Sequence, residues 1–209
     1  MRDLEYNKDI TIEEGWATHM RLEEKTISSE AIFDGRILHV RLDRVTLPDG
    51  KEATREVVHH IGAVAVLPLT ESGEVILERQ YRYPFGEVLV EIPAGKLESP
   101  EEDPRKAALR ELEEETGMVA ESLQYLGDYY PSPAVFDERI RLYLATGLTP
   151  TRQHTDEDEF LEVFTMPLEE LIDQIMAGNI PDGKTQVAAL RVYHTLQTKK
   201  GEQEHEAQL

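Results

Sequence analysis

Residues 95–118 read GKLESPEEDPRKAALRELEEETGM, and they contain the clearest helix signal in the chain. The pattern predicts a helix over 104–116. Asp103 can cap its N-terminus, Pro104 suits its first turn, and Gly117 stands where a left-handed C-terminal stop belongs. Both ends of the predicted helix therefore carry a boundary signal in the sequence.

The glutamates in the last turns of this helix are poorly placed for a helix that serves stability alone. Glu111 and Glu115 lie on one face, about 40° apart, Glu114 flanks that face, and Glu113 points almost the opposite way. Like charges four residues apart repel by roughly 0.2–0.5 kcal/mol, and acids near a helix C-terminus oppose its dipole. A hard divalent cation prefers carboxylate oxygen and would reverse this repulsion. We therefore interpret this face as a metal site rather than as a solvated acidic surface.

Short apolar stretches on both sides of the helix predict strands. Residues 61–69 (IGAVAVLPL) are nearly all apolar, which is typical of a central strand buried on both faces. Further strands are expected at 37–47, 52–60, 74–82, 87–93, 123–130, 139–146 and 159–166. Two more helices are expected at 167–177 and 185–198, followed by a frayed polar tail at 202–209. Strands with helices on both sides predict a mixed sheet sandwiched between helices.

The N-terminal part of the chain has a different pattern. Residues 1–21 show no clear period, and alternating stretches begin at Lys25. A turn at Pro48-Asp49-Gly50-Lys51 separates two predicted strands. These strands are too few to bury both of their faces alone, so we expect them to pack on another subunit or on the main body.

The composition limits the partners and the chemistry. Acidic residues number 42 against 22 basic ones, a net charge of −20, which repels nucleic acid and anionic membranes. The absence of cysteine excludes disulfides, thiolate metal sites and a cysteine nucleophile. No apolar run approaches the roughly 20 residues of a spanning helix, and no signal peptide is visible. We expect a cytoplasmic protein without nucleic-acid or membrane partners, and an anionic substrate would require bound cations.

The stretch from Gly95 to Met118 resembles the Nudix box. The second half, from Arg110 onward, matches that pattern at every fixed position. Counting back from Arg110 places the first glutamate at Glu102, one residue further from Gly95 than in the family, which leaves the roles of Glu101 and Glu102 open. The resemblance implies an α+β Nudix fold, with a mixed β-sheet in an α/β/α sandwich and an N-terminal antiparallel sheet.

The same resemblance implies a divalent-metal site. Glu111, Glu115 and the backbone carbonyl of Ala94 would bind Mg²⁺, with Mn²⁺ as a possible substitute, and Glu114 would be a nearby or supporting ligand. Arg110 would pair with Glu102 or Glu101 to brace the loop against the helix. Such a site would act on a diphosphate bridge, because bound cations neutralise phosphate charge.

From about residue 24 to 196, the chain is similar to ADP-ribose pyrophosphatases, which split ADP-ribose into AMP and ribose 5-phosphate. Ser132-Pro133-Ala134 resembles the Ser-Pro-Gly turn of this subfamily. Planar guanidinium groups suit phosphate contacts and base stacking, and an aromatic ring could stack on adenine. The resemblance assigns substrate binding to Phe33, Arg55, Glu56, Arg82, Ser132 and Glu138.

An acidic loop at 156–159 resembles the catalytic loop of the same subfamily. By that resemblance Glu157 would be the general base that activates water, and Glu159 would contribute to metal binding. The choice between Glu157 and Glu159 as the base stays open. Glu111 and Glu115 would complete the catalytic set.

The resemblance also implies a homodimer, because close members of the subfamily exchange their N-terminal sheets. We therefore divide the chain into 1–60, a dimerising antiparallel sheet, and 61–209, the Nudix hydrolase domain. Two alternatives for the function remain. One is hydrolysis of another nucleotide sugar, such as GDP-mannose. The other is a non-catalytic module that senses a nucleotide, which should show damage in the 110–115 block, and this block is intact.

Overall fold

The computed structural model describes residues 22–155 and 159–206. The described residues form two compact units, one comprising 22–60 and 132–138 and the other comprising 61–131, 139–155 and 159–206. None of the described helices is both long and apolar enough to cross a membrane.

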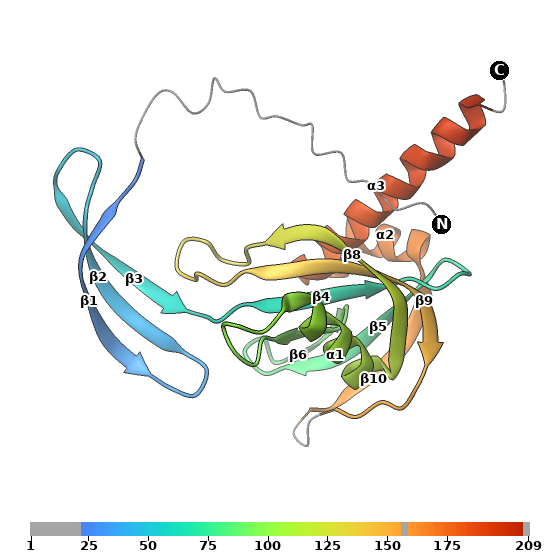
Figure 1. Cartoon of the computed structure of the whole chain (residues 1–209), viewed down its shortest axis with the longest axis horizontal. Coiled ribbons are helices and arrows are strands. Elements are labelled where there is room, and N and C mark those ends of the chain that lie inside the picture. The colour runs from blue at the N-terminus through green and yellow to red at the C-terminus, as the bar shows by residue number, and fades with distance from the viewer. Residues whose placement is uncertain (1–21, 156–158, 207–209) are drawn as a thin grey trace. The chain divides into compact units, whose positions relative to one another are not determined.

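The first unit is a three-stranded antiparallel sheet in the order β1-β2-β3 (Figure 1). Its strands are β1 (Lys25–Asp34), β2 (His39–Thr46) and β3 (Glu52–His59). The turn predicted between β2 and β3 is confirmed, with Gly50 at a φ of 84° and its N–H donating to the Leu47 carbonyl. Every residue of β1 is exposed, so this sheet has little core of its own.

The second unit is built on two sheets. The four-stranded sheet has the order β7-β4-β9-β8, with β4 and β9 parallel and the other pairs antiparallel. The three-stranded sheet has the order β10-β5-β6 and is antiparallel. The strands are β4 (Ala63–Pro68), β5 (Glu74–Arg82), β6 (Glu87–Glu91), β7 (Ala94–Lys96), β8 (Met118–Tyr129), β9 (Ile140–Pro150) and β10 (Leu161–Pro167). The predicted α+β fold with a mixed sheet and an N-terminal antiparallel sheet is confirmed.

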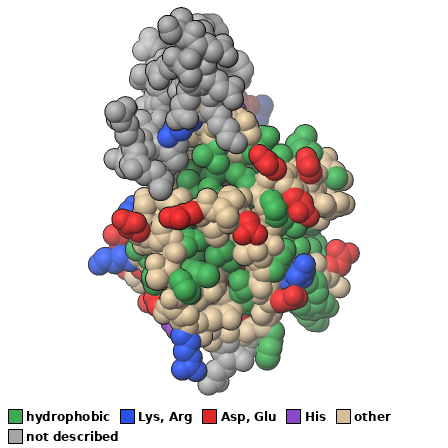
Figure 2. Space-filling model, turned by 90° about the vertical axis from the view of Figure 1, so that its right-hand side faces the viewer, with side chains coloured by type: hydrophobic (Ala, Val, Ile, Leu, Met, Phe, Trp, Pro, Cys, Tyr) green, Lys and Arg blue, Asp and Glu red, His purple; other side chains and the backbone are tan. Residues whose placement is uncertain are grey.

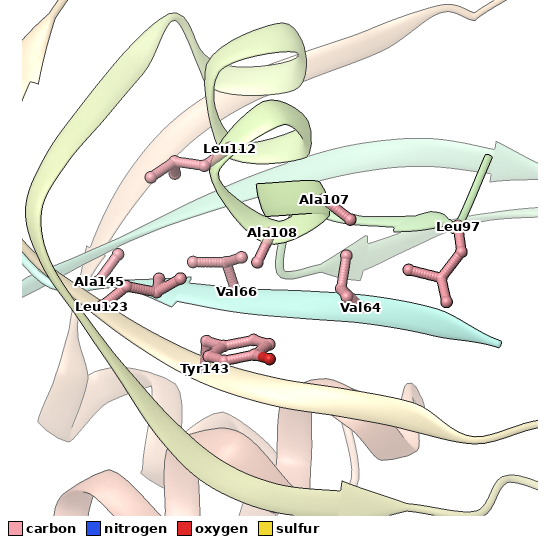
Figure 3. Close-up of a cluster of buried hydrophobic side chains, with 9 residues drawn as sticks. All are labelled: Val64, Val66, Leu97, Ala107, Ala108, Leu112, Leu123, Tyr143 and Ala145. Carbon is pink, nitrogen blue, oxygen red and sulfur yellow. The ribbon is translucent and has the colours of Figure 1, made fainter. Parts of the chain in front are cut away.

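The helices are α1 (Pro104–Thr116), α2 (Leu168–Met176) and α3 (Gly183–Glu206). Helices α1 and α3 cover the two faces of the four-stranded sheet, whereas α2 packs against α3, β5 and β10 (Figure 1). All six residues of β4 are buried, which confirms the predicted central strand. Helix α1 packs on one face through the hydrophobic cluster in Figure 3, and α3 contacts β4, β8 and β9 as well. The cluster comprises Val64, Val66, Leu97, Ala107, Ala108, Leu112, Leu123, Tyr143 and Ala145.

Helix α1 has the predicted ends. Asp103 accepts a hydrogen bond from the Arg105 N–H at 2.9 Å, and Gly117 adopts a left-handed φ of 66°. The small side chains of Ala107 and Ala108 let the helix lie close to the sheet. The carboxylates one turn further along the same face are therefore carried into the interior.

Several element boundaries differ from the prediction. Helix α3 continues to Glu206, so the expected polar tail is wrong for 202–206, because the Glu and Gln residues there favour a helix. Strand β8 begins directly after α1 at Met118, where it pairs with Pro150, so β9 is also longer than expected. Residues 94–96, which lie outside the predicted strands and helices, form β7 against β4.

Candidate functional site

Two glutamates of α1 meet the backbone of β7. Glu111 and Glu115 are only 8% and 2% exposed. The Ala94 N–H donates to the Glu115 carboxylate at 2.8 Å. A Cβ on Gly95 would lie 2.1 Å from the carboxyl carbon of Glu111, so the Glu111 carboxylate occupies the space that any larger residue would need. The Ala-Gly pair thus brings the Ala94 peptide and both carboxylates together.

Arg110 fixes the outer side of this cluster. Its guanidinium donates to Glu111 at 2.8 Å and to Glu114 at 3.0 Å. It also lies 3.4 Å from Glu102, which accepts a second hydrogen bond from the Glu98 N–H at 2.6 Å. Arg110 therefore lies against Glu102 of the acidic pair, and Glu114 is held at the rim of the cluster by Arg110.

Burial makes the charged forms of these acids costly. It raises the pKa of Glu111 to about 7, although Arg110 partly offsets the effect. Burial raises the pKa of Glu115 further, and the charges of Glu78, Glu111 and Glu159 act in the same direction. Acids crowded in this way hold either protons or cations near neutral pH.

Glu78 belongs to this cluster and was missed by the sequence analysis. It lies on β5 with no exposed surface, and neither of its carboxylate oxygens has a hydrogen-bond partner among residues 22–155 and 159–206. Burial raises its pKa, and Glu91 and Glu159 add to the shift. A signal for it exists in the sequence, because an acid directly follows the apolar run Val75 to Leu77 within one strand.

One face of β5 carries a row of polar side chains, because residues two apart on a strand share a face. Glu78, Gln80 and Arg82 form this row. Gln80 donates to Glu159 at 3.0 Å, which places Glu159 beside the cluster. Arg82 donates through two nitrogens to buried Glu91 at 2.6 and 2.7 Å.

Glu91 differs from Glu78, its neighbour across the β5–β6 pair, because two cationic side chains balance its charge. Burial acts against its charge, yet the hydrogen bonds from Arg82 and the nearby Lys184 ammonium lower its pKa overall. Lys184 is itself buried, and Asp182 and Glu91 raise its pKa despite that burial. Arg82, predicted to bind substrate phosphate, therefore already engages a carboxylate.

The other predicted substrate residues belong to the N-terminal unit, whereas the carboxylates and Arg82 belong to the second unit. Phe33 on β1 is 56% exposed, and Arg55 on β3 donates to Glu24 at 2.9 Å. Glu56 is exposed on β3.

The remaining predicted substrate residues lie in the loop at 132–138. The Ser132 carbonyl accepts hydrogen bonds from the Val135 and Phe136 N–H groups. The Glu138 carboxylate lies 3.7 Å from His60. Glu157 lies outside the described residues.

The donor set suits a divalent cation, although the side chains do not yet enclose one. Within 22–155 and 159–206, no group of three or more His, Asp or Glu side chains stands ready to hold a metal ion. The available donors are nevertheless all oxygens, and the two of Glu78 have no partner. Hard divalent cations take such ligands. On the face in Figure 2, by contrast, acidic side chains are scattered among apolar ones, as on an ordinary solvated surface.

Known proteins resemble the chain along most of its length. The NUDIX domain family matches residues 59–189, and the nucleoside diphosphate sugar hydrolase N-terminal domain matches residues 24–58. A methanol dehydrogenase activator of Bacillus methanolicus is 46% identical over 168 residues, which are 79% of this chain and 90% of that protein. An ADP-ribose pyrophosphatase of Bacillus subtilis (strain 168) is 44% identical over 183 residues, 86% and 98% of the two chains.

A solved structure confirms the fold. The crystal structure of an ADP compounds hydrolase superposes with a TM-score of 0.75 over 87% of this chain and 97% of that chain, at 22% sequence identity. At this identity the likeness concerns the fold alone.

Proposed function

This chain belongs to the Nudix hydrolase family, and we propose that it hydrolyses the diphosphate bridge of ADP-ribose to give AMP and ribose 5-phosphate. The observation that carries the proposal is the pair of buried α1 carboxylates, Glu111 and Glu115, set against the Ala94 peptide. The similarity to an ADP-ribose pyrophosphatase extends over nearly the whole of that protein and so supports the same substrate here.

Nudix hydrolases use divalent metal, and we propose Mg²⁺, with Mn²⁺ as a substitute. Glu111, Glu115 and the Ala94 carbonyl would hold it, with Glu159 as a further ligand and Glu114 in support through Arg110. When bound, the cations would neutralise the diphosphate and make water more acidic. These residues supply the all-oxygen ligand set that Mg²⁺ requires.

The chemical step is hydrolysis without a covalent enzyme intermediate. Water attacks one phosphorus of the bridge, the bond from that phosphorus to the bridging oxygen breaks, and two monophosphates leave. Glu157 would take the proton from the attacking water, because a general base must reach that proton directly. If Glu157 does not reach it, Glu159 is the other candidate, since it lies at the edge of the carboxylate cluster.

Aromatic, basic, acidic and hydroxyl side chains would bind the substrate. We propose that Phe33 stacks on adenine and that Arg55 and Glu56 bind the nucleoside part. Arg82 would reach the phosphates with the side of its guanidinium that Glu91 does not occupy. Ser132 and Glu138 would also bind the substrate.

Purified protein with Mg²⁺ and a panel of ADP-ribose, GDP-mannose and other nucleoside diphosphate derivatives tests this function, with products separated by chromatography. We expect AMP and ribose 5-phosphate from ADP-ribose at the highest kcat/KM. Preference for GDP-mannose would establish the alternative nucleotide-sugar hydrolase. Absence of turnover on every substrate would instead establish a non-catalytic module and refute the proposal.

We also propose a homodimer formed through residues 1–60 and a cytoplasmic location. The exposed apolar side chains of Ile27, Ile32 and Phe33 on β1 support the dimer, because a three-stranded sheet without a core needs a partner surface. Light scattering after size exclusion measures the mass directly. A monomer at micromolar concentration would refute the dimer. Ile32→Glu should weaken the dimer without unfolding residues 61–209.

A further inference from the structure

Glu78 occupies a position where strand packing alone would favour an apolar residue. It lies on β5, the middle strand of the β10-β5-β6 sheet, and pairs directly with Glu91 of β6. Directly opposed like charges destabilise an antiparallel pair. The preceding residues Val75, Ile76 and Leu77 are all buried, so a fourth apolar residue would have continued the core.

The two opposed glutamates differ in their partners. Glu91 receives hydrogen bonds from Arg82 and Lys184, which balance its charge. Glu78 is equally buried, but in the part of the chain that the structure describes neither of its oxygens has a hydrogen-bond partner. A buried carboxyl without a partner is destabilising whether it is charged or neutral. The sequence thus keeps a costly group at this point, although Glu91 shows that the same sheet can satisfy a buried acid.

The surroundings of Glu78 indicate which partner it would accept. Gln80 shares a face of β5 with Glu78 and donates to Glu159 at 3.0 Å, so Glu159 lies beside the same stretch of β5. The charge of Glu78 also raises the pKa of Glu115. Glu159 raises the pKa of Glu78 as well as that of Glu115. Three elements therefore bring carboxylates to one region: β5 contributes Glu78, α1 contributes Glu115, and the segment before β10 contributes Glu159. Such an anionic region accepts a cation far more readily than an anion.

We propose that Glu78 is an additional ligand of the divalent-metal site and shares a cation with Glu115. The proposal rests on the metal site of the proposed function and extends it by a residue outside the Nudix box. Carboxylate oxygens of Glu78, Glu115 and Glu159 are the hard donors that Mg²⁺ and Mn²⁺ bind. Because these side chains do not enclose an ion as they stand, small side-chain rotations must bring them onto it. Glu91 takes no part, since its charge is already balanced.

Mn²⁺ binding to the metal-free full-length protein tests this role without reference to catalysis. Titration followed by the electron paramagnetic resonance of free Mn²⁺ gives the number of ions bound and their dissociation constants. Glu78→Gln keeps the shape of the side chain and removes its charge. We expect it to weaken at least one Mn²⁺ site by tenfold or more. Glu162→Gln, which removes an exposed carboxylate from the neighbouring strand β10, should bind Mn²⁺ like the wild type.

Thermal unfolding provides a second readout. Glu78→Val extends the apolar run of β5, so in EDTA its Tm should lie above that of the wild type, and Mn²⁺ should raise its Tm by less than it raises the wild-type Tm. This variant also decides the matter if Glu78→Gln proves unstable. Mn²⁺ affinities within twofold of the wild type, with the same number of ions bound, would overturn the proposal.

The proposed hydrolase function and the role of Glu78 as a metal ligand can be refuted separately. If the wild type hydrolyses ADP-ribose and both Glu78 variants bind Mn²⁺ normally, only the role of Glu78 falls. If the wild type binds Mn²⁺ through Glu78 but hydrolyses no nucleotide, the proposed function falls and the metal ligand stands.

Discussion

Gly95→Ala is expected to disable the site while leaving the fold intact. A Cβ at this position would lie 2.1 Å from the carboxyl carbon of Glu111, and 2.1 and 2.3 Å from its two oxygens. Real Cβ atoms do not approach other atoms closer than 3.0 Å, so the Glu111 carboxylate must retreat by about 1 Å. Metal–ligand distances tolerate only about 0.2 Å. Displacement on this scale costs on the order of 100-fold in rate, or about 2.7 kcal/mol of transition-state stabilisation.

The backbone at Gly95 makes this a clean perturbation. Gly95 is not among the glycines with positive φ, so alanine can adopt its conformation. We therefore expect kcat/KM for ADP-ribose at saturating Mg²⁺ to fall by about 100-fold, with a change in unfolding free energy below about 1 kcal/mol. Steady-state kinetics and urea unfolding measure the two quantities.

Gly201→Ala is the matched control. Gly201 lies in α3 with nothing within 4 Å of the position of its would-be Cβ, so alanine should retain full activity and stabilise the helix by up to about 1 kcal/mol. If Gly95→Ala kept its activity within threefold of the wild type, the placement of Glu111 against β7 would be wrong as a description of the working site.

Three further predictions concern α1 and the acidic loop. Glu115→Gln should lower turnover by 10³-fold or more while the fold is retained, because Glu115 is a proposed metal ligand. Glu157→Gln should slow turnover but keep the affinity for Mn²⁺, because Glu157 is the proposed general base. An equal loss of Mn²⁺ affinity in both variants would contradict these separate roles. Burial raises the pKa of Glu111 to about 7 in the folded, metal-free protein, whereas the ordinary pKa of this carboxyl is 4.5. Between these two pH values the folded protein therefore holds a proton that the unfolded chain has released. Glu111 should therefore contribute a loss of about 3 kcal/mol of stability in EDTA as pH rises from 4.5 through 7. Urea unfolding would measure the total loss, and Glu111→Gln should remove this part of it. Asp103→Ala should destabilise the protein by about 1 kcal/mol through the lost cap on the Arg105 N–H, and an unchanged urea midpoint would contradict that.

Signals between residues close together in the sequence were sufficient to predict the ends of α1 and the buried strand β4. The ends of α1 followed from Asp103 and Gly117, because capping and left-handed stops involve residues within one turn. The buried strand β4 followed from an unbroken apolar run. The spacing of Glu111 and Glu115 fixed their common helix face before any tertiary contact was known. The predicted end of α3 at residue 198 was wrong, because the helix continues to Glu206 through polar residues that carry no apolar periodicity in the sequence.

The sequence by itself therefore determined the family, the helix face that carries Glu111 and Glu115, and the mixed-sheet fold. Only the tertiary structure decided which groups meet that face. It selected Glu102 rather than Glu101 as the partner of Arg110, brought Gly95 against Glu111 and set Glu78 opposite Glu91. Such pairings depend on strand register and on how closely α1 packs on the sheet, and no short-range spacing encodes either.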